Sequence, residues 1–379
     1  MKSLDTARVA LVHDWLTGMR GGEKCLEVLC QRFPNAPLHT LLHAKGSLSP
    51  DIEQMDIRPS WLNRLPGIVS NYRYTLPLMP FAADWPIRNC DLLVSFSHAV
   101  AKAAKPPVGV PHVSYCFTPM RYAWHMRDSY FAGRLGGVKS LAVNRLLKAI
   151  RNWDRRTSSR VTHFIAISKT IQDRIRECYG RESVIIYPPA DTAFYSPDPA
   201  IKREDFYLII SAFAPYKRLD LAIEACKKLN KRLIVIGSGQ DAARLRAMAG
   251  PTVEFLGWKS NEELRGHLRR CRALLFPGEE DFGIVPVEAN ACGTPVIAFA
   301  KGGATETVTP FGEPRPTGFW FAEQTVDSLA SAIETCEREH HGLNPADARA
   351  KAEMFDKKRY EQELLGYLAK VLNEHGSKK

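Results

Sequence analysis

Short apolar runs alternate with helix-like segments along the whole chain, and this alternation constrains the fold more than any other feature. In the first half the apolar runs lie at Val9–Trp15, Asp91–Ser97, His112–Phe117, Val161–Ser168 and Ser183–Pro189. The pattern starts again with "FYLIISAF" at Phe206–Phe213 and continues through "RLIVIGSG", "TVEFLGW", "RALLFP" and "PVIAFA". Strands that alternate with amphipathic helices are typical of βαβ units, which build parallel sheets. The sequence therefore predicts an α/β protein.

The break between the two halves predicts two doubly wound, Rossmann-like domains that face a central cleft. The segment "YPPADTAFYSPDPAIKRED" is rich in Pro and Asp, and its composition favours a linker near Asp191–Ile201. We expect an N-terminal, acceptor-side domain over residues 1–195 and a C-terminal, nucleotide-sugar-binding domain over residues 196–355. Residues 356–379 are expected to form a C-terminal helix and tail that can cross back to the N-terminal domain.

Composition narrows the class of protein. The 379 residues carry a formal net charge of +11, which favours anionic partners such as phosphates, nucleic acid or an acidic membrane surface. Nine cysteines without a CxxC pair predict reduced thiols in the cytoplasm rather than a disulfide framework or a zinc site. No apolar run approaches the ~20 residues that span a bilayer, and the N-terminus does not resemble a signal peptide.

Glycines follow several predicted strands. Gly18, Gly21 and Gly22 precede a helix expected to begin near Glu23, and Gly237 follows "RLIVI". Glycines before a helix let backbone N–H groups approach an anion, although a tight strand–helix turn would explain them equally well. The second loop lacks the third glycine of a dinucleotide fingerprint and the acid expected ~20 residues later, so a nicotinamide enzyme is not favoured.

A basic pair, Lys217 and Arg218, lies between a predicted strand and a predicted helix. Cations at a helix N-terminus oppose the helix dipole, so a compensating anion is expected. A ligand phosphate would supply that anion. The alternative is that both side chains extend into water.

The stretch "GEEDFGIVPVEANA" holds two carboxylates eight residues apart, Glu280 in a loop and Glu288 in the helix that follows. Carboxylates accept hydrogen bonds from vicinal hydroxyls, as in a ribose or a hexose. The amides of Phe282, Gly283 and Ile284 lie at the predicted helix N-terminus and can face a phosphate. Together these groups suit a nucleotide sugar, whereas an acidic loop that caps the helix would explain only one or two of the acids.

These motifs resemble the retaining GT-B glycosyltransferases of family four, whose E-x7-E pattern matches Glu280 and Glu288. The segments "APYKRLDLAIEA", "VIGSGQ", "EFLGW", "GGATETV" and "TGFWF" follow in the expected order, and "LVHDWLTGMRGGEKCLE" with "HVSYCFTPMRYAW" resembles the WbaZ-like mannosyltransferases of O-antigen and exopolysaccharide assembly. The resemblance implies a metal-independent, retaining hexosyltransferase without a cofactor. The donor it implies is GDP-mannose, with UDP-glucose or another donor as the alternative.

The resemblance also assigns roles to residues of this chain. It implies that Glu288 holds the nucleotide ribose and that Glu280 contacts hydroxyls of the transferred sugar. Lys217, helped by Arg218, would neutralise the departing diphosphate. Further donor contacts are implied for Gly21, Gly22, Gly237, Phe282, Gly283 and Ile284.

Two positions depart from the family pattern. Ala212 stands where relatives usually carry Arg, and Phe117 stands where they often carry a histidine near the reacting sugar. His13 and His98 each follow a predicted strand and could occupy the same space, although a histidine there is more often structural. Arg121 is a candidate contact for an acceptor or a donor phosphate.

The acceptor side is predicted from two further segments. Lys139–Arg160 has a basic, amphipathic helical pattern that suits anionic lipid, or a domain helix whose apolar stripe lies in the core. Asn63–Trp85 is rich in aromatic residues and proline and is expected on the acceptor side. A polyprenyl-diphosphate-linked acceptor would imply peripheral association with the inner face of the plasma membrane. A non-catalytic sugar-nucleotide or glycan-binding protein is the alternative class; a nucleic-acid partner is not expected, because no reading module is present.

Overall fold

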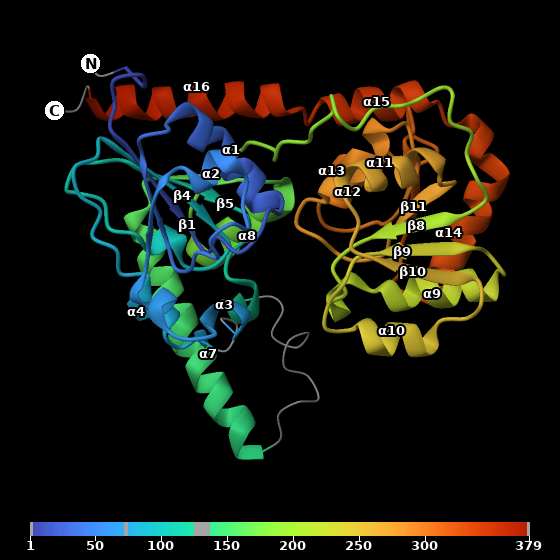
Figure 1. Ribbon diagram of the computed structural model, residues 1–379, viewed down its shortest axis with the longest axis horizontal. Coiled ribbons are helices and arrows are strands. Elements are labelled where there is room, and N and C mark those ends of the chain that lie inside the picture. The colour runs from blue at the N-terminus through green and yellow to red at the C-terminus, as the bar shows by residue number, and fades with distance from the viewer. Residues whose placement is uncertain (1–2, 72–74, 125–136, 377–379) are drawn as a thin grey trace. The chain divides into compact units, whose positions relative to one another are not determined.

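The computed structural model describes residues 3–71, 75–124 and 137–376 (Figure 1). The chain divides into two compact units. Unit 1 comprises Met1–Pro188 and Tyr360–Lys379, and unit 2 comprises Pro189–Arg359. The expected boundaries at 195/196 and 355/356, with their acceptor-side and donor-side roles, stay predictions.

Within the described residues, unit 1 contains a seven-stranded, fully parallel sheet with the order β3-β2-β1-β4-β5-β6-β7. Its strands are β1 (Val9–His13), β2 (Pro37–Thr40), β3 (Asp56–Pro59), β4 (Leu92–Ser97), β5 (His112–Cys116), β6 (His163–Ala166) and β7 (Ser183–Ile185). The runs expected as strands in this half are all strands, with shorter bounds. The sequence pattern missed β2 and β3, because neither is a continuous apolar run and β3 is an exposed or half-buried edge strand.

The helices of unit 1 cover this sheet. They are α1 (Gly21–Arg32), α2 (Pro50–Glu53), α3 (Ile68–Asn71), α4 (Met79–Ala82), α5 (Arg121–Trp124), α7 (Gly137–Thr157) and α8 (Lys169–Tyr179), with the 3-10 turns η1 (Trp61–Arg64), η3 (Ala101–Ala103) and η4 (Ser158–Arg160). The C-terminal helix α16 (Lys357–Gly376) belongs to unit 1 from Tyr360 onward. The Tyr360 hydroxyl donates to the Cys25 carbonyl at 3.2 Å, and its ring meets Tyr115 at 5.7 Å.

Helix α7 shows which interpretation of the basic segment holds. Leu147 and Ile150 are buried, and Trp153 packs against the same core as Ile150. These residues form the stripe of a domain helix, so the core interpretation is confirmed for them. Leu146 is exposed, and the side chains of residues 139–142 lie outside the described part.

Unit 2 contains, among its described residues, a six-stranded parallel sheet with the order β10-β9-β8-β11-β12-β13. Its strands are β8 (Tyr207–Ile210), β9 (Leu233–Ile236), β10 (Val253–Gly257), β11 (Ala273–Phe276), β12 (Val296–Phe299) and β13 (Gly318–Phe321). Its helices are α9 (Leu219–Lys228), α10 (Ala242–Met248), α11 (Asn261–Arg270), α12 (Ile284–Ala291), α13 (Ala304–Thr307), α14 (Val326–Glu339) and α15 (Pro345–Glu353), with η5 (Pro215–Lys217) and η6 (His340–Gly342). Helices α9 and α10 lie on one side of this sheet, and α11 and α12 lie on the other (Figure 1).

Each sheet reverses its strand order once, and this reversal fixes where a ligand is expected. In unit 1 the reversal lies between β1 and β4, and in unit 2 it lies between β8 and β11. Loops that leave two such strands run to opposite sides and open a crevice at the carboxyl ends, where open α/β sheets bind ligands. The residues that follow these four strands are therefore the first places to look for a site.

Candidate functional site

In unit 2 the reversal point brings together Lys217 and Glu280. Lys217 ends η5 after β8, and Glu280 follows β11, the neighbouring strand. Their Nζ and Oε1 atoms lie 2.5 Å apart, and the side chains are 14% and 21% exposed, so solvent reaches both. A Cβ atom at Gly278 would come within 3.0 Å of the Lys217 backbone, so the glycine allows the two loops to touch. Two residues far apart in the chain thus form one ion pair at the expected edge.

This ion pair corrects the argument that a ligand phosphate must balance the basic pair. Lys217 already has Glu280 as its counter-ion. Arg218 lies at the N-cap of α9 with φ of 54°, and its Nε lies 3.2 Å from Oδ1 of Asp220. Protein carboxylates therefore offset both cations and the conflict with the helix dipole. The roles of Lys217 and Arg218 toward a diphosphate stay predictions that need another argument.

The loop that carries Glu280 leads into α12 through Gly283, whose φ of 90° occupies the left-handed region. The N-cap of α12 is this glycine rather than an acid. The Phe282 side chain is buried and meets Phe355 edge-on at 5.4 Å, so only its backbone could face a ligand. Helix α12 begins at Ile284, as expected, and its first amides lie at the N-terminus where an anion is stabilised.

Glu288 lies in the second turn of α12 and is 6% exposed. Burial raises the pKa of the neighbouring Tyr195 phenol, and the charge of Glu288 raises it further. Glu288 is therefore held within the protein beside a neutral tyrosine. Its contact with a ribose stays a prediction.

The glycine loops of unit 2 have a packing reason. A Cβ atom at Gly237 would lie 1.9 Å from the Ser211 carbonyl oxygen, and one at Gly303 would lie 2.2 Å from Cα of Phe282. The Gly303 N–H also donates to the Glu280 carbonyl at 2.7 Å. Close backbone contact thus demands these glycines, as the tight-turn interpretation held for such loops. The donor contact of Gly237 stays a prediction.

In unit 1 the predicted residues that follow β1, β4 and β5 come together. The ring centroids of His13, His98 and Phe117 lie 6.2 to 6.4 Å from one another. A Cβ atom at Gly22 would come within 3.3 Å of the Phe117 ring and 3.4 Å of Nε2 of His13, whereas Gly21 has open space around it. Helix α1 begins at Gly21 and not near Glu23, so these two glycines supply the first amides of the helix. Arg121 begins α5, in the segment that follows Phe117.

The two histidines differ in their surroundings. His13 is 1% exposed, and burial lowers its pKa to about 4, so its ring is neutral at pH 7. Its Nδ1 lies 3.0 Å from the Trp15 carbonyl oxygen. His98 is 31% exposed, and its Nδ1 lies 3.0 Å from Oδ2 of Asp14. His98 is therefore the histidine that a ligand could reach, and His13 fits the structural role.

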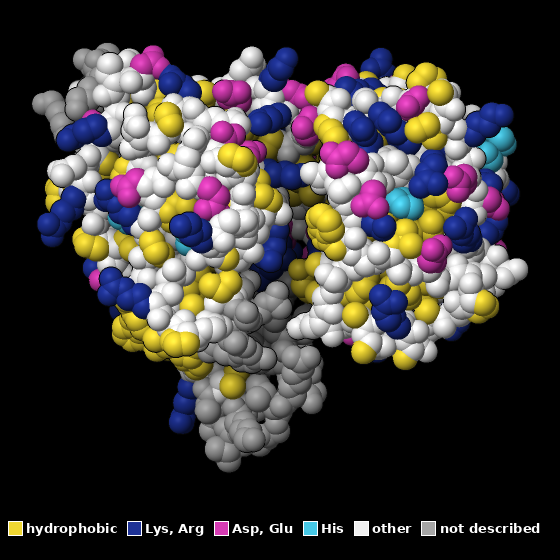
Figure 2. All heavy atoms as spheres, in the orientation of Figure 1, with side chains coloured by type: hydrophobic (Ala, Val, Ile, Leu, Met, Phe, Trp, Pro, Cys, Tyr) yellow, Lys and Arg dark blue, Asp and Glu magenta, His cyan; other side chains and the backbone are white. Residues whose placement is uncertain are grey.

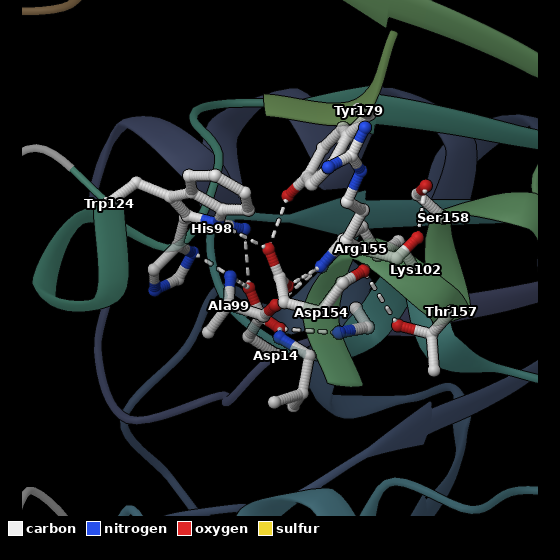
Figure 3. A network of polar contacts seen from close by, with 12 residues as sticks. Asp14, His98, Ala99, Lys102, Trp124, Asp154, Arg155, Thr157, Ser158 and Tyr179 are labelled. Carbon is white, nitrogen blue, oxygen red and sulfur yellow. Dashed lines mark hydrogen bonds and ion pairs between the residues drawn. The ribbon is translucent and has the colours of Figure 1, made fainter. Parts of the chain in front are cut away.

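Sequence reasoning missed Asp14. Its carboxylate is fully buried and accepts four backbone N–H groups, from residues 98 to 101, at 2.6 to 2.9 Å (Figure 3). These residues lie more than 80 positions away along the chain. The available signal was an acid directly after a buried strand, "VALVHD", which is where functional side chains gather in parallel sheets.

Sequence reasoning also missed the chemistry of Glu23. This residue lies in the first turn of α1, and its Oε2 accepts the Arg20 N–H at 3.1 Å. Burial raises the pKa of Glu23 to about 7, and the nearby charge of Asp14 contributes to the increase. A buried acid therefore lies beside the amides of Gly21 and Gly22. In sequence it is indistinguishable from an ordinary capping residue.

Comparison with known proteins agrees with this geometry. Residues 191–354 match the family described as Glycosyl transferases group 1. A GDP-mannose-dependent alpha-(1-6)-phosphatidylinositol monomannoside mannosyltransferase of Mycobacterium tuberculosis is 28% identical over 197 residues, which are 44% of this chain and 50% of that protein. Glycosyltransferase MJ1178 of Methanocaldococcus jannaschii is 28% identical over 179 residues, 46% of this chain and 50% of that protein. This chain thus spans about half the length of the curated relatives it matches.

The solved structure of Anabaena Alr3699/HepE in complex with UDP and glucose covers nearly the whole chain. The TM-score is 0.70 at 19% identity, over 96% of this chain and 99% of that one. The two parallel sheets and this similarity define the class of the fold as GT-B. With the match over most of unit 2, the chain belongs to the glycosyl transferase group 1 family.

Proposed function

We propose that this protein is a retaining, metal-independent glycosyltransferase that moves a hexose from a nucleotide sugar to a saccharide acceptor. The observation that carries the proposal is the Lys217–Glu280 pair at the β8/β11 reversal point, inside a group 1 glycosyl transferase domain. One member of the pair suits a diphosphate and the other suits sugar hydroxyls. Both side chains are open to solvent.

The chemistry follows from where charge develops. When the bond between the sugar and the diphosphate breaks, the leaving group gains negative charge while the sugar becomes cationic. The Lys217 ammonium and the first amides of α12 would stabilise the leaving group, which would accept the proton of the attacking hydroxyl on the same face. Without donor, Glu280 holds the ammonium in place. With donor, the phosphate would take over the ammonium, and Glu280 would be released to bind sugar hydroxyls.

GDP-mannose is the proposed donor. It rests on the resemblance of the N-terminal half to mannosyltransferases and on the GDP-mannose dependence named for the mycobacterial relative. UDP-glucose is the competing donor, because the similar Anabaena protein holds UDP and glucose. Glu288 is proposed to hold the ribose of either donor.

Thermal unfolding with added nucleotides tests the donor. A ligand at 100 times its dissociation constant stabilises the folded state by about 2.7 kcal/mol, which raises Tm by several degrees in a domain of this size. We expect GDP and GDP-mannose to raise Tm, and UDP and UDP-glucose to have little effect. A shift with UDP alone would replace the base, and the absence of any shift would contradict nucleotide-sugar binding.

The alternative function is a non-catalytic sugar-nucleotide or glycan-binding protein of the same fold, for which Ala212 and Phe117 are the support. Release of nucleotide from labelled GDP-mannose separates the two functions. Binding without release, with or without saccharide acceptors, would favour the alternative. The intact Lys217–Glu280 pair favours the enzyme.

The proposed acceptor is a growing O-antigen or polysaccharide chain carried on a polyprenyl diphosphate, which would place the protein on the inner face of the plasma membrane. Among the described helices, none combines the length and the apolar character that a bilayer crossing requires. Peripheral contact has a surface, because Trp61, Leu65, Leu78 and Phe81 are 41% to 74% exposed. Hydrophobic side chains gather over α4, with Lys and Arg at the margin (Figure 2).

Vesicle sedimentation tests this contact. We expect binding to vesicles that contain anionic lipid, weakened as salt rises, because apolar side chains and cations act together at such a surface. Replacing Trp61 and Phe81 with serine should lower the bound fraction at least about tenfold, since each loses roughly 1.5–3 kcal/mol of apolar burial. Trp258→Ser is the matched control, because Trp258 is 80% exposed on unit 2. Equal loss in the control, or none in either, would contradict the contact.

A further inference from the structure

We propose that His98 contacts a hydroxyl of the transferred sugar through Nε2, and that Asp14 is the positioning residue that fixes the His98 ring. The identity of the ligand rests on the proposed function. The placement of the two residues does not, because it follows from unit 1 alone.

His98 and Asp14 lie at the reversal point of the unit 1 sheet. Asp14 directly follows β1, and His98 directly follows β4, the strand beside it. Among the strands of this sheet, β1 and β4 are the pair whose connections run to opposite sides. The amides of Gly21 and Gly22 open the helix that follows β1, so polar groups converge there from two segments.

Asp14 is fixed so tightly that it can act as an anchor. Oδ2 accepts the N–H groups of His98 and Ala99 at 2.6 and 2.9 Å, and Oδ1 accepts those of Val100 and Ala101, each at 2.6 Å. The carboxylate is fully buried. A carboxylate held by four amides cannot rotate without breaking several hydrogen bonds, so the position of Oδ2 is set by the backbone.

This anchor selects the orientation and the tautomer of His98. Because Oδ2 accepts from Nδ1 at 3.0 Å, the proton of the neutral ring belongs on Nδ1. The lone pair then lies on Nε2, which can accept a hydrogen bond from a sugar hydroxyl. Trp15 holds the ring from another side, edge-on, with 4.3 Å between centroids. Figure 3 shows His98 and Ala99 directed at Asp14.

His98 is distinguished from His13 by exposure. His13 packs against Gly22 and Phe117 and is 1% exposed, whereas 31% of the His98 side chain reaches solvent. Such a part-exposed ring, held by a buried acid, is pre-organised for a ligand. A histidine that only closed the loop would not need an accessible edge.

Two substitutions separate contact with the ligand from a structural role. In His98→Asn the amide nitrogen can take the place of Nδ1 and keep the bond to Asp14, while nothing reaches the position of Nε2. In His98→Gln the amide reaches the position of Nε2 and gives up the bond to Asp14. We expect Asn to keep the wild-type Tm and to lower kcat/KM for nucleotide release from GDP-mannose roughly ten- to hundredfold. Gln should retain more activity than Asn, and GDP affinity should be unchanged in both.

The matched control is His163→Asn, because His163 begins β6 at the amino end of the same sheet. It should leave kcat/KM at the wild-type value. Wild-type activity in His98→Asn, or retention in Asn with loss in Gln, would overturn the contact. Equal weakening of GDP and GDP-mannose would assign His98 to the diphosphate and overturn the hydroxyl assignment. If the wild type itself neither binds nor turns over any nucleotide sugar, the proposed function fails and the sugar contact fails with it.

Nitrogen-15 spectra of labelled histidine in the full-length protein supply a second readout. The His98 signals, assigned by their loss in His98→Asn, should show a protonated Nδ1 and an unprotonated Nε2. GDP-mannose should shift the Nε2 signal, and GDP should not. The opposite tautomer would overturn the role of Asp14, and an unmoved Nε2 signal under saturating GDP-mannose would overturn the contact.

Discussion

Replacement of Lys217 with alanine is expected to lower kcat/KM for nucleotide release from GDP-mannose by about 10²- to 10³-fold. Loss of one pre-organised group that stabilises developing charge has an effect of this size. The loss is large here because Lys217 meets the charge at a part-buried strand end, where its ammonium now pairs with Glu280. Initial rates at saturating and limiting donor would place most of the loss in kcat.

The control for this prediction lies in the same loop. Lys301 is 66% exposed and faces Glu279 at 3.5 Å, one residue before Glu280. Lys301→Ala removes a cation from a neighbouring acid without touching the reversal point, and it should change kcat/KM less than about threefold, as exposed pairs contribute little. Equal rates for both variants, each folded with wild-type Tm, would remove Lys217 from the mechanism.

Replacement of Lys102 with methionine is expected to lower the free energy of unfolding of unit 1 by about 3–5 kcal/mol. Lys102 and Asp154 form a fully buried ion pair, and Asp154 also accepts from Trp124 Nε1 and the Tyr179 hydroxyl, each at 2.8 Å (Figure 3). Methionine matches the lysine stem in volume but leaves the Asp154 charge buried without its cation. Urea unfolding followed by the fluorescence of unit 1 tryptophans measures the loss.

Two further variants make this prediction specific. Lys105→Met removes an exposed partner of Asp84 and should cost less than about 1 kcal/mol. The double variant Lys102→Met with Asp154→Asn should recover part of the loss, because the unpaired charge is then gone. A cost below that of Lys105→Met, or no recovery in the double variant, would show that the buried pair contributes little.

Much of the fold could be predicted from local patterns. Buried parallel strands are continuous apolar runs, so β1, β4, β5, β8, β9, β11 and β12 stand out without any knowledge of their neighbours. The edge strand β3 is exposed or half-buried along its length, and β2 is half-buried at alternate positions, so neither has the pattern on which that prediction depends. Helix α12 could be predicted because its glycines lie at both ends of an apolar run.

The candidate site could be predicted in its residue types but not in its pairings. Lys217 and Glu280 each follow an apolar run, which places them at strand ends. The interpretation of Lys217 and Arg218 as cations in need of a ligand anion failed, because Glu280 and Asp220 already face them. A counter-ion that arrives from a distant loop leaves no local trace.

The sequence by itself determined the strands, the helix that carries Glu288, and which polar residues end the strands, since each depends on side chains a few positions apart. Only the tertiary structure decided that β11 lies beside β8 and that β4 lies beside β1. Strand order is set by the burial of whole faces and by loops of many lengths, which no short window contains. That order joins Lys217 to Glu280 and Asp14 to His98, and it gives both sites their chemistry.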